Sequence, residues 1–103
     1  METIKVFWVD DEHEKFTSFK NLAKDKNILI TARDNAQDAT IEIQKNIQNY
    51  DAVILDANFK EYQDSPVENR RGTFAIRLQK VIRKITTEIP IFVLSGKIFD
   101  ESW

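Results

Sequence analysis

The sequence contains no cysteine, only two glycines and two prolines, and no long apolar run. Without thiols, the chain can form neither a disulfide framework nor a thiolate metal site. There is no signal peptide and no apolar stretch of about 18 residues, so we expect a cytoplasmic protein that makes no membrane contact. The formal net charge of -2 excludes a broadly basic surface, and we therefore expect no direct nucleic-acid binding.

Four apolar, β-branched stretches alternate with three stretches of helical periodicity over 103 residues. This length predicts one domain, residues 1–103. The predicted strands are Ile4–Val9, Ile28–Ala32, Ala52–Leu55 and Ile89–Leu94. The predicted helices cover residues 13–26, 36–47 and 72–85. Because right-handed crossovers join parallel strands, the pattern predicts an α/β fold with helices on both faces of a mostly parallel sheet.

Several local features refine this prediction. The runs 52–55 and 89–94 are almost wholly apolar, which predicts strands buried on both faces. Asp34 or Asn35 can cap the second helix. Residues 60–71 are rich in charge and lack an apolar period, which predicts a long exposed loop that is either inert or selects a partner.

Candidate site residues follow three of the four predicted strands. Asp10 and Asp11 come after the first strand, Asp56 after the third and Ser95 after the fourth. If the first and third strands are neighbours, three carboxylates meet at the carboxyl edge of the sheet, where ligands bind in open α/β folds. Such close acids oppose one another's ionisation unless they share a dication, and Mg²⁺ accepts this ligand set.

Each of these residues also has a simpler explanation. An isolated Asp after a strand is commonly a turn former, and Asp10 or Asp11 could cap the first helix. We expect His13 to be a solvated residue at the start of that helix. Trp8 reads as a core residue on the same side of the sheet as Asp10, because alternate residues of a strand share a face.

Three motifs carry a resemblance to a known family. VDDE at 9–12, LDAN at 55–58 and LSGK at 94–97 resemble the receiver domain of two-component response regulators. The resemblance implies that Asp56 accepts a phosphoryl group from a phosphohistidine, that Asp10 and Asp11 form the acidic Mg²⁺ pair, that Asn58 offers a backbone carbonyl to the metal and that Ser95 contacts the phosphate. A histidine kinase or phosphotransfer protein would be the partner.

The resemblance further implies a flavodoxin-like sheet of strand order 2-1-3-4 in a phosphorelay domain. Such a domain catalyses its own phosphorylation to an aspartyl phosphate and is not a conventional enzyme. The family's fifth strand, which ends in Lys, and its fifth helix have no counterpart here, so we expect a receiver that is incomplete at the C-terminus. The loop after Asp56 is also longer than the family's, since Gly72 lies 16 residues beyond Asp56.

These departures leave two other interpretations open. One is a pseudo-receiver that binds partners without being phosphorylated, and the other is a Mg²⁺-dependent phosphatase or nuclease-like enzyme. The apolar fourth strand would also lack a neighbour on its outer edge. We therefore expect a homodimer or a swapped assembly through that edge, or else aggregation.

Overall fold

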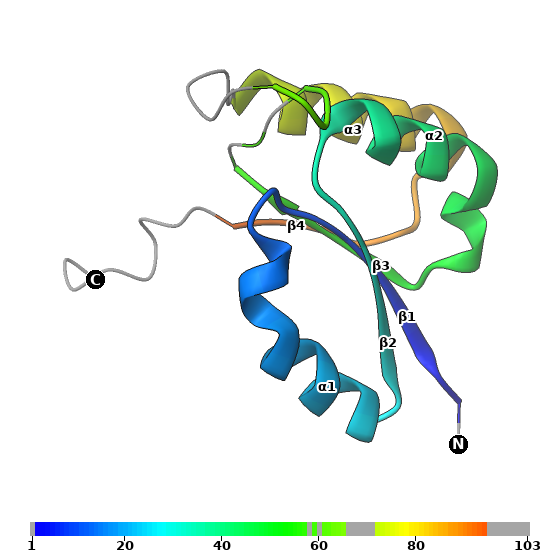
Figure 1. Ribbon diagram of the computed structural model, residues 1–103. Coiled ribbons are helices and arrows are strands. Elements are labelled where there is room, and N and C mark those ends of the chain that lie inside the picture. Colours follow the sequence, from blue (N-terminus) through cyan, green and yellow to red (C-terminus); the bar gives the residue numbers. More distant parts are fainter. Residues whose placement is uncertain (1, 58, 60, 66–71, 95–103) are drawn as a thin grey trace, which may run out of the picture.

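The polypeptide forms a single parallel sheet with helices on both faces, as the computed structural model shows (Figure 1). The structure describes residues 2–57, 59, 61–65 and 72–94. The strands are β1 (Ile4–Val9), β2 (Ile28–Arg33), β3 (Ala52–Asp56) and β4 (Ile91–Leu94). The helices are α1 (Thr17–Asp25), α2 (Ala36–Asn46) and α3 (Gly72–Ile85), with short 3-10 turns at His13–Phe16 and Ile47–Asn49.

The strand order is β2-β1-β3-β4, and all neighbouring pairs are parallel. The predicted α/β class and the flavodoxin-like order 2-1-3-4 are therefore confirmed. Parallel strands require crossovers, and the three helices supply them. Of the predicted loop at 60–71, only residues 61–65 are described, and in that part the backbone N–H of Gln37 donates to the Glu61 carbonyl (2.9 Å).

The main core lies between the sheet and the α2/α3 layer, above the sheet in Figure 1. Its strand residues are Phe7, Val9, Val53 and Leu55, and its helix residues include Ala39, Ile43, Leu78 and Ile82. All eight are fully buried, and burying each of the side chains larger than that of Ala39 contributes roughly 1.5–3 kcal/mol. These helix residues recur at helical spacing on the side of α2 and α3 that faces the sheet, whereas Ile85, at the end of α3, is exposed.

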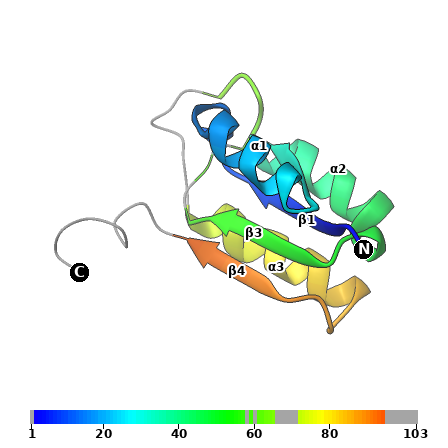
Figure 2. The ribbon, with the colours of Figure 1, turned by 90° about the horizontal axis from the view of Figure 1, so that it is seen from below.

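The opposite face of the sheet is covered by α1 alone among the described helices (Figures 1 and 2). The rings of Phe16 and Phe19 lie against Trp8, with centroids 5.4 and 6.3 Å away, and Trp8 is buried as expected. Within α1 only Ala23 is buried, whereas Phe19 and Leu22 are more than half exposed. The expected apolar stripe exists, but no other described helix packs against it.

The prediction that 52–55 and 89–94 are buried on both faces was wrong. In β3, Val53 and Leu55 are buried beneath α2 and α3, but Ile54 on the α1 face is only half-buried. In β4, Phe92 is 55% exposed and Leu94 is also exposed. Figure 2 shows why, because no described helix lies in front of β3 and β4 on this side. Apolar runs signal burial only where a second layer is present.

Candidate metal centre

The three predicted acids meet where β1 and β3 end side by side. Val9 pairs with Leu55 in the parallel register, so the next residues, Asp10 and Asp56, come opposite each other. Alternate residues of a strand share one face of the sheet. Asp10 therefore lies on the same side as Trp8, and Asp56 on the same side as Ile54, which is the side that α1 covers. Asp11 begins the turn into the first helical segment.

Asp10, Asp11 and Asp56 each present a carboxylate oxygen, and these oxygens all lie within 4.8 Å of one another. All three side chains are half-buried, and Oδ1 of Asp11 is withdrawn from solvent. Carboxylate oxygens are the ligands that hard cations prefer, and a half-exposed site lets Mg²⁺ keep several waters. The residues present therefore suit a hard dication, and the acidic cluster could bind a metal ion.

Asp10 also has a structural role in this site. Its Oδ1 accepts a hydrogen bond from the Glu12 backbone N–H at 2.8 Å, which holds the turn after β1. The alternative that Asp10 or Asp11 caps the first helix is wrong, because Glu12 is the N-cap residue of the 3-10 turn and Phe16 is that of α1. A carboxylate oxygen has two lone pairs, so this bond does not exclude Asp10 as a ligand.

The charge of Asp10 is disfavoured by its surroundings. Burial raises the pKa of Asp10 above the ordinary value of 3.8; the hydrogen bond from Glu12 acts in the opposite sense, and the neighbouring Asp11 charge raises the pKa further. A bound dication would reverse the balance, because an opposite charge close by favours the ionised carboxylate. The electrostatics are those expected of acids placed close together to share a cation.

Two residues expected at this site, Asn58 and Ser95, lie outside the described residues. Leu94, the residue before Ser95, pairs with Asp56 in the sheet register, and its carbonyl accepts a hydrogen bond from Ala57 N–H at 2.6 Å. The structure therefore brings the end of β4 beside Asp56.

One contact beside the site was missed by sequence reasoning. Nζ of Lys20 lies 2.7 Å from Nδ1 of His13, and its charge lies 5.8 Å from the ring centroid of Trp8. The ammonium can only donate, so His13 accepts at Nδ1 and carries its own proton on Nε2. His13 is half-buried rather than freely solvated. The seven-residue spacing, about two helical turns, was the available signal.

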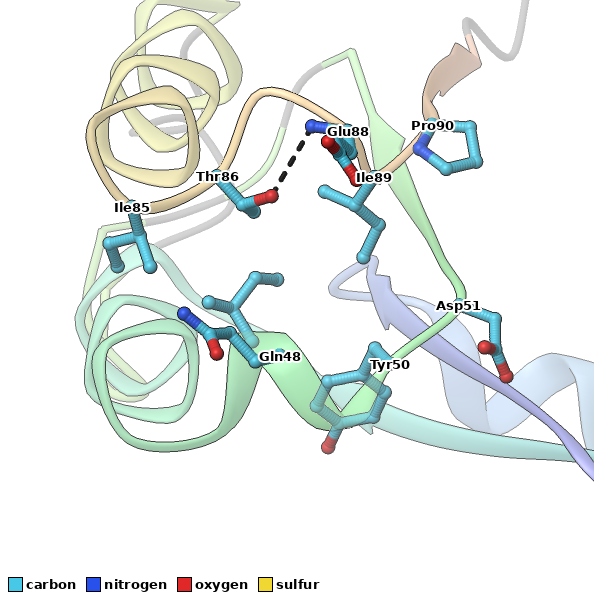
Figure 3. A pocket seen from close by; sticks show the side chains of 9 residues that line it. Gln48, Tyr50, Asp51, Ile85, Thr86, Glu88, Ile89 and Pro90 are labelled. Atoms are coloured by element: carbon cyan, nitrogen blue, oxygen red, sulfur yellow. Dashed lines mark hydrogen bonds between the residues drawn. The ribbon is translucent and has the colours of Figure 1, made fainter.

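A hollow lies at the other end of the sheet (Figure 3). This hollow of about 440 Å³ is lined by the segments 47–51 and 85–90. The hydroxyl of Thr86 accepts from the Glu88 backbone N–H (3.2 Å), and the Tyr50 hydroxyl and Asp51 carboxylate point away from the centre (Figure 3). It lies at the amino ends of the strands, remote from the carboxyl edge where the acids meet.

Comparisons with known proteins add no assignment: no protein-family model matches the chain, and no curated protein is significantly similar to it. In the part of the chain that the structure describes, no helix is both long and apolar enough to cross a membrane. The geometry of the acids therefore carries the functional argument.

Proposed function

We propose that this chain is a receiver-type signalling module in which Asp56 accepts a phosphoryl group from a phosphohistidine with the help of Mg²⁺. One observation carries the proposal: Asp10, Asp11 and Asp56 come from two different strand ends, and their carboxylate oxygens converge within 4.8 Å. A nucleophilic carboxylate must lie beside the acids that hold the metal, and this arrangement satisfies that need.

The reaction transfers one phosphoryl group between two protein side chains. An oxygen of Asp56 attacks the phosphorus in line, the new P–O bond forms as the P–N bond of the donor breaks, and the imidazole leaves with its ring nitrogen free to take a proton. When bound, Mg²⁺ would offset the negative charge on the phosphoryl oxygens. Asp10 and Asp11 would hold the cation, and Asp56, which is only half-buried, would attack the donor.

The remaining parts of the proposal concern residues outside the described part of the chain. Asn58 would add its backbone carbonyl to the metal ligands, and Ser95 would donate a hydrogen bond to the phosphoryl group and transmit the signal.

The donor would be a histidine kinase or phosphotransfer protein in the cytoplasm. The chain would act as a response regulator component that phosphorylates itself from the donor and would not turn over a separate substrate.

Intact mass spectrometry after incubation with acetyl phosphate and Mg²⁺ tests this function. Wild type should gain the mass of one phosphoryl group, and Asp56→Asn should gain none. Asp51→Asn is the matched control, because Asp51 is an exposed acid at the other end of the sheet. An adduct that persists in Asp56→Asn, or that forms equally well with EDTA, would contradict the proposal.

The same experiment separates the alternatives. Mg²⁺ binding without any adduct, from acetyl phosphate or from beryllofluoride, would favour a pseudo-receiver that only binds partners. Multiple turnover of a generic phosphate ester would instead favour a Mg²⁺-dependent phosphatase.

A further inference from the structure

The ammonium of Lys20 is held by two uncharged groups near the converging acids. Its Nζ donates to Nδ1 of His13 at 2.7 Å and lies 5.8 Å from the ring centroid of Trp8, within the range of a cation–π contact. Lys20 is half-buried, and in the part of the chain that the structure describes no carboxylate forms an ion pair with it. Its positive charge is therefore held in place without being neutralised by an acid.

Two other lysines of this region differ from Lys20. Lys15 is exposed and forms an ion pair with Glu12 (3.4 Å), and Lys24 is exposed one turn further along α1. Withdrawing a charge from water costs free energy unless the charge is paired. Of these three ammonium groups, that of Lys20 therefore gains most from an incoming anion.

The strand register shows where Lys20 lies relative to the acids. Trp8 is opposite Ile54 in the pairing of β1 with β3. Because alternate residues share a face, the next side chains on this face are those of Asp10 and Asp56. Two residues of a strand span about 7 Å, so an ammonium that contacts Trp8 lies one row of side chains from the acids. The flexible four-carbon stem of a lysine can cover such a step.

His13 connects this ammonium to the turn that carries two of the acids. The backbone N–H of His13 donates to the Asp10 carbonyl at 3.2 Å. Its imidazole interacts electrostatically with both Lys20 and Asp10. The group that holds the ammonium therefore belongs to the same turn as Asp10 and Asp11.

A phosphoryl group on Asp56 would bring more negative charge to this site than a dication can offset. A phosphoryl group carries about two negative charges at neutral pH, and Asp10 and Asp11 contribute two more. A dication would offset only half of this charge. Hydrogen bonds from a cation to phosphoryl oxygens are roughly twice as strong as those between neutral groups. The phosphorylated site therefore favours a further cation on this face of the sheet.

We propose that Lys20 is a catalytic residue for the phosphoryl transfer, whose ammonium leaves Nδ1 of His13 and donates to the phosphoryl oxygens at Asp56. Its resting contacts with His13 and Trp8 keep the ammonium out of an ion pair with the acids, so its charge is available when the donor arrives. This inference rests on the proposed function and adds to it a residue that stabilises the charge of the transferred group.

The rate of adduct formation tests this role by intact mass spectrometry. Lys20→Met keeps the apolar stem over Trp8 and removes the ammonium. With acetyl phosphate and Mg²⁺, Lys20→Met should gain the phosphoryl group about tenfold more slowly than wild type, because one charge-assisted hydrogen bond is lost. Lys20→Arg should recover most of the rate, since it keeps the charge and the donors. Lys24→Met, which removes an exposed ammonium of the same helix, should react as wild type does.

Movement of the ammonium is tested by NMR, which does not depend on the rate. The chain has one histidine, so the ring-nitrogen signals of His13 cannot be confused with those of another. At a pH where the imidazole is neutral, adding beryllofluoride to wild type in Mg²⁺ should shift the Nδ1 signal, because its hydrogen-bond donor leaves. The same addition to Lys20→Met should shift that signal far less.

The outcomes separate this inference from the phosphoacceptor role of Asp56. If Lys20→Met gains the adduct as fast as wild type, or if beryllofluoride shifts the Nδ1 signal equally in both proteins or in neither, the role of Lys20 is overturned and that of Asp56 stands. If wild type gains no adduct at all, both are overturned.

Discussion

His13 interacts electrostatically with the positive charge of Lys20 and with three nearby acids. Burial lowers its pKa below the ordinary 6.5, and the ammonium of Lys20 lowers it further, while Asp34, Glu14 and Asp10 act in the opposite sense. Because the folded pKa lies below the unfolded one, the neutral imidazole stabilises the fold fully above pH 6.5. That contribution is lost as the pH falls through the lowered pKa.

We expect the imidazole of His13 to titrate below pH 6.5 in metal-free protein, and Lys20→Gln to move its pKa upward, because the repulsion from the ammonium is removed. The chain has a single histidine, so an NMR titration needs no assignment of its signal. Lys24→Gln, an exposed lysine of the same helix, is the control and should leave the titration unchanged. A His13 pKa at or above 6.5 in wild type would contradict the geometry of the His13–Lys20 contact.

The start of α2 depends on one buried polar side chain, Asn35, which is 0% exposed. Its Oδ1 accepts from the Asp38 backbone N–H at 2.8 Å, and its Nδ2 donates to Asp34 (2.6 Å) and to the Asp38 side chain (2.9 Å). The side chain thus satisfies a helix N-terminal donor that has no partner within the helix. It also joins the end of β2 to the helix that covers the core.

Asn35→Ala should lower the free energy of unfolding by about 1–2 kcal/mol, because the cap is lost and buried polar groups are left without their bonds. Urea unfolding followed by circular dichroism measures this. Asn35→Ser keeps a capping oxygen and should lose less. Gln44→Ala, exposed in the last turn of the same helix, should stay within about 0.5 kcal/mol of wild type. Equal midpoints for Asn35→Ala and Gln44→Ala would show that the cap contributes nothing.

The helices and strands of this fold were predictable because the spacing of the apolar residues agrees with the turn-forming and capping residues that lie between the apolar stretches. Alternating apolar stretches and helical stripes predicted four strands and three helices. The cap of α2 was predicted to be Asp34 or Asn35, and it is Asn35. Boundaries shifted by one or two residues: β2 runs on to Arg33, and β4 begins at Ile91, after Pro90. The first helix opens with a 3-10 turn at His13–Phe16, which no apolar pattern distinguishes from an α-helical turn.

Which parts of the sheet are covered by helices was less predictable than the helices and strands themselves. An apolar residue such as Phe92 carries no sign of whether a second layer will cover it, since that depends on elements distant in sequence. The convergence of Asp10, Asp11 and Asp56 was predictable on the condition that β1 and β3 are neighbours, because the carboxyl ends of parallel strands share an edge. The sequence pattern alone did not fix that strand order, which the family resemblance implied. The contact between His13 and Lys20 was not, since it depends on the geometry of one turn.

Folding the whole chain brings three acids together, and this should cost stability when no cation is present. A raised pKa means that the folded state holds the proton of Asp10 more tightly than the unfolded chain does. The free energy of unfolding contributed by this group therefore falls as the pH rises from the ordinary 3.8 through the raised pKa, and stays lower at neutral pH. Mg²⁺ should offset that loss by binding the folded state alone.

Thermal unfolding at neutral pH measures both the stability lost through the charge of Asp10 and the stability regained when Mg²⁺ binds. With EDTA, Asp10→Asn should be more stable than wild type by about 1 kcal/mol or less, which corresponds to a few degrees in Tm. The difference is small because the carboxyl is half-exposed and its charge is partly screened. Asn at this position keeps the acceptor for Glu12 N–H. Saturating Mg²⁺, at about 100 times its Kd, should stabilise wild type by about 2.7 kcal/mol and Asp10→Asn far less.

Asp51→Asn is the matched control, because the Asp51 carboxylate also accepts a backbone N–H at 2.8 Å, from Lys5, but lies at the opposite end of the sheet. It should respond to Mg²⁺ as wild type does. The Mg²⁺-dependent gain should also shrink as the pH falls toward the raised pKa of Asp10, since protons then compete for the ligand oxygens. A gain that is the same in all three proteins, or independent of pH, would mean that the cation acts elsewhere on the surface and that the converging acids do not form its site.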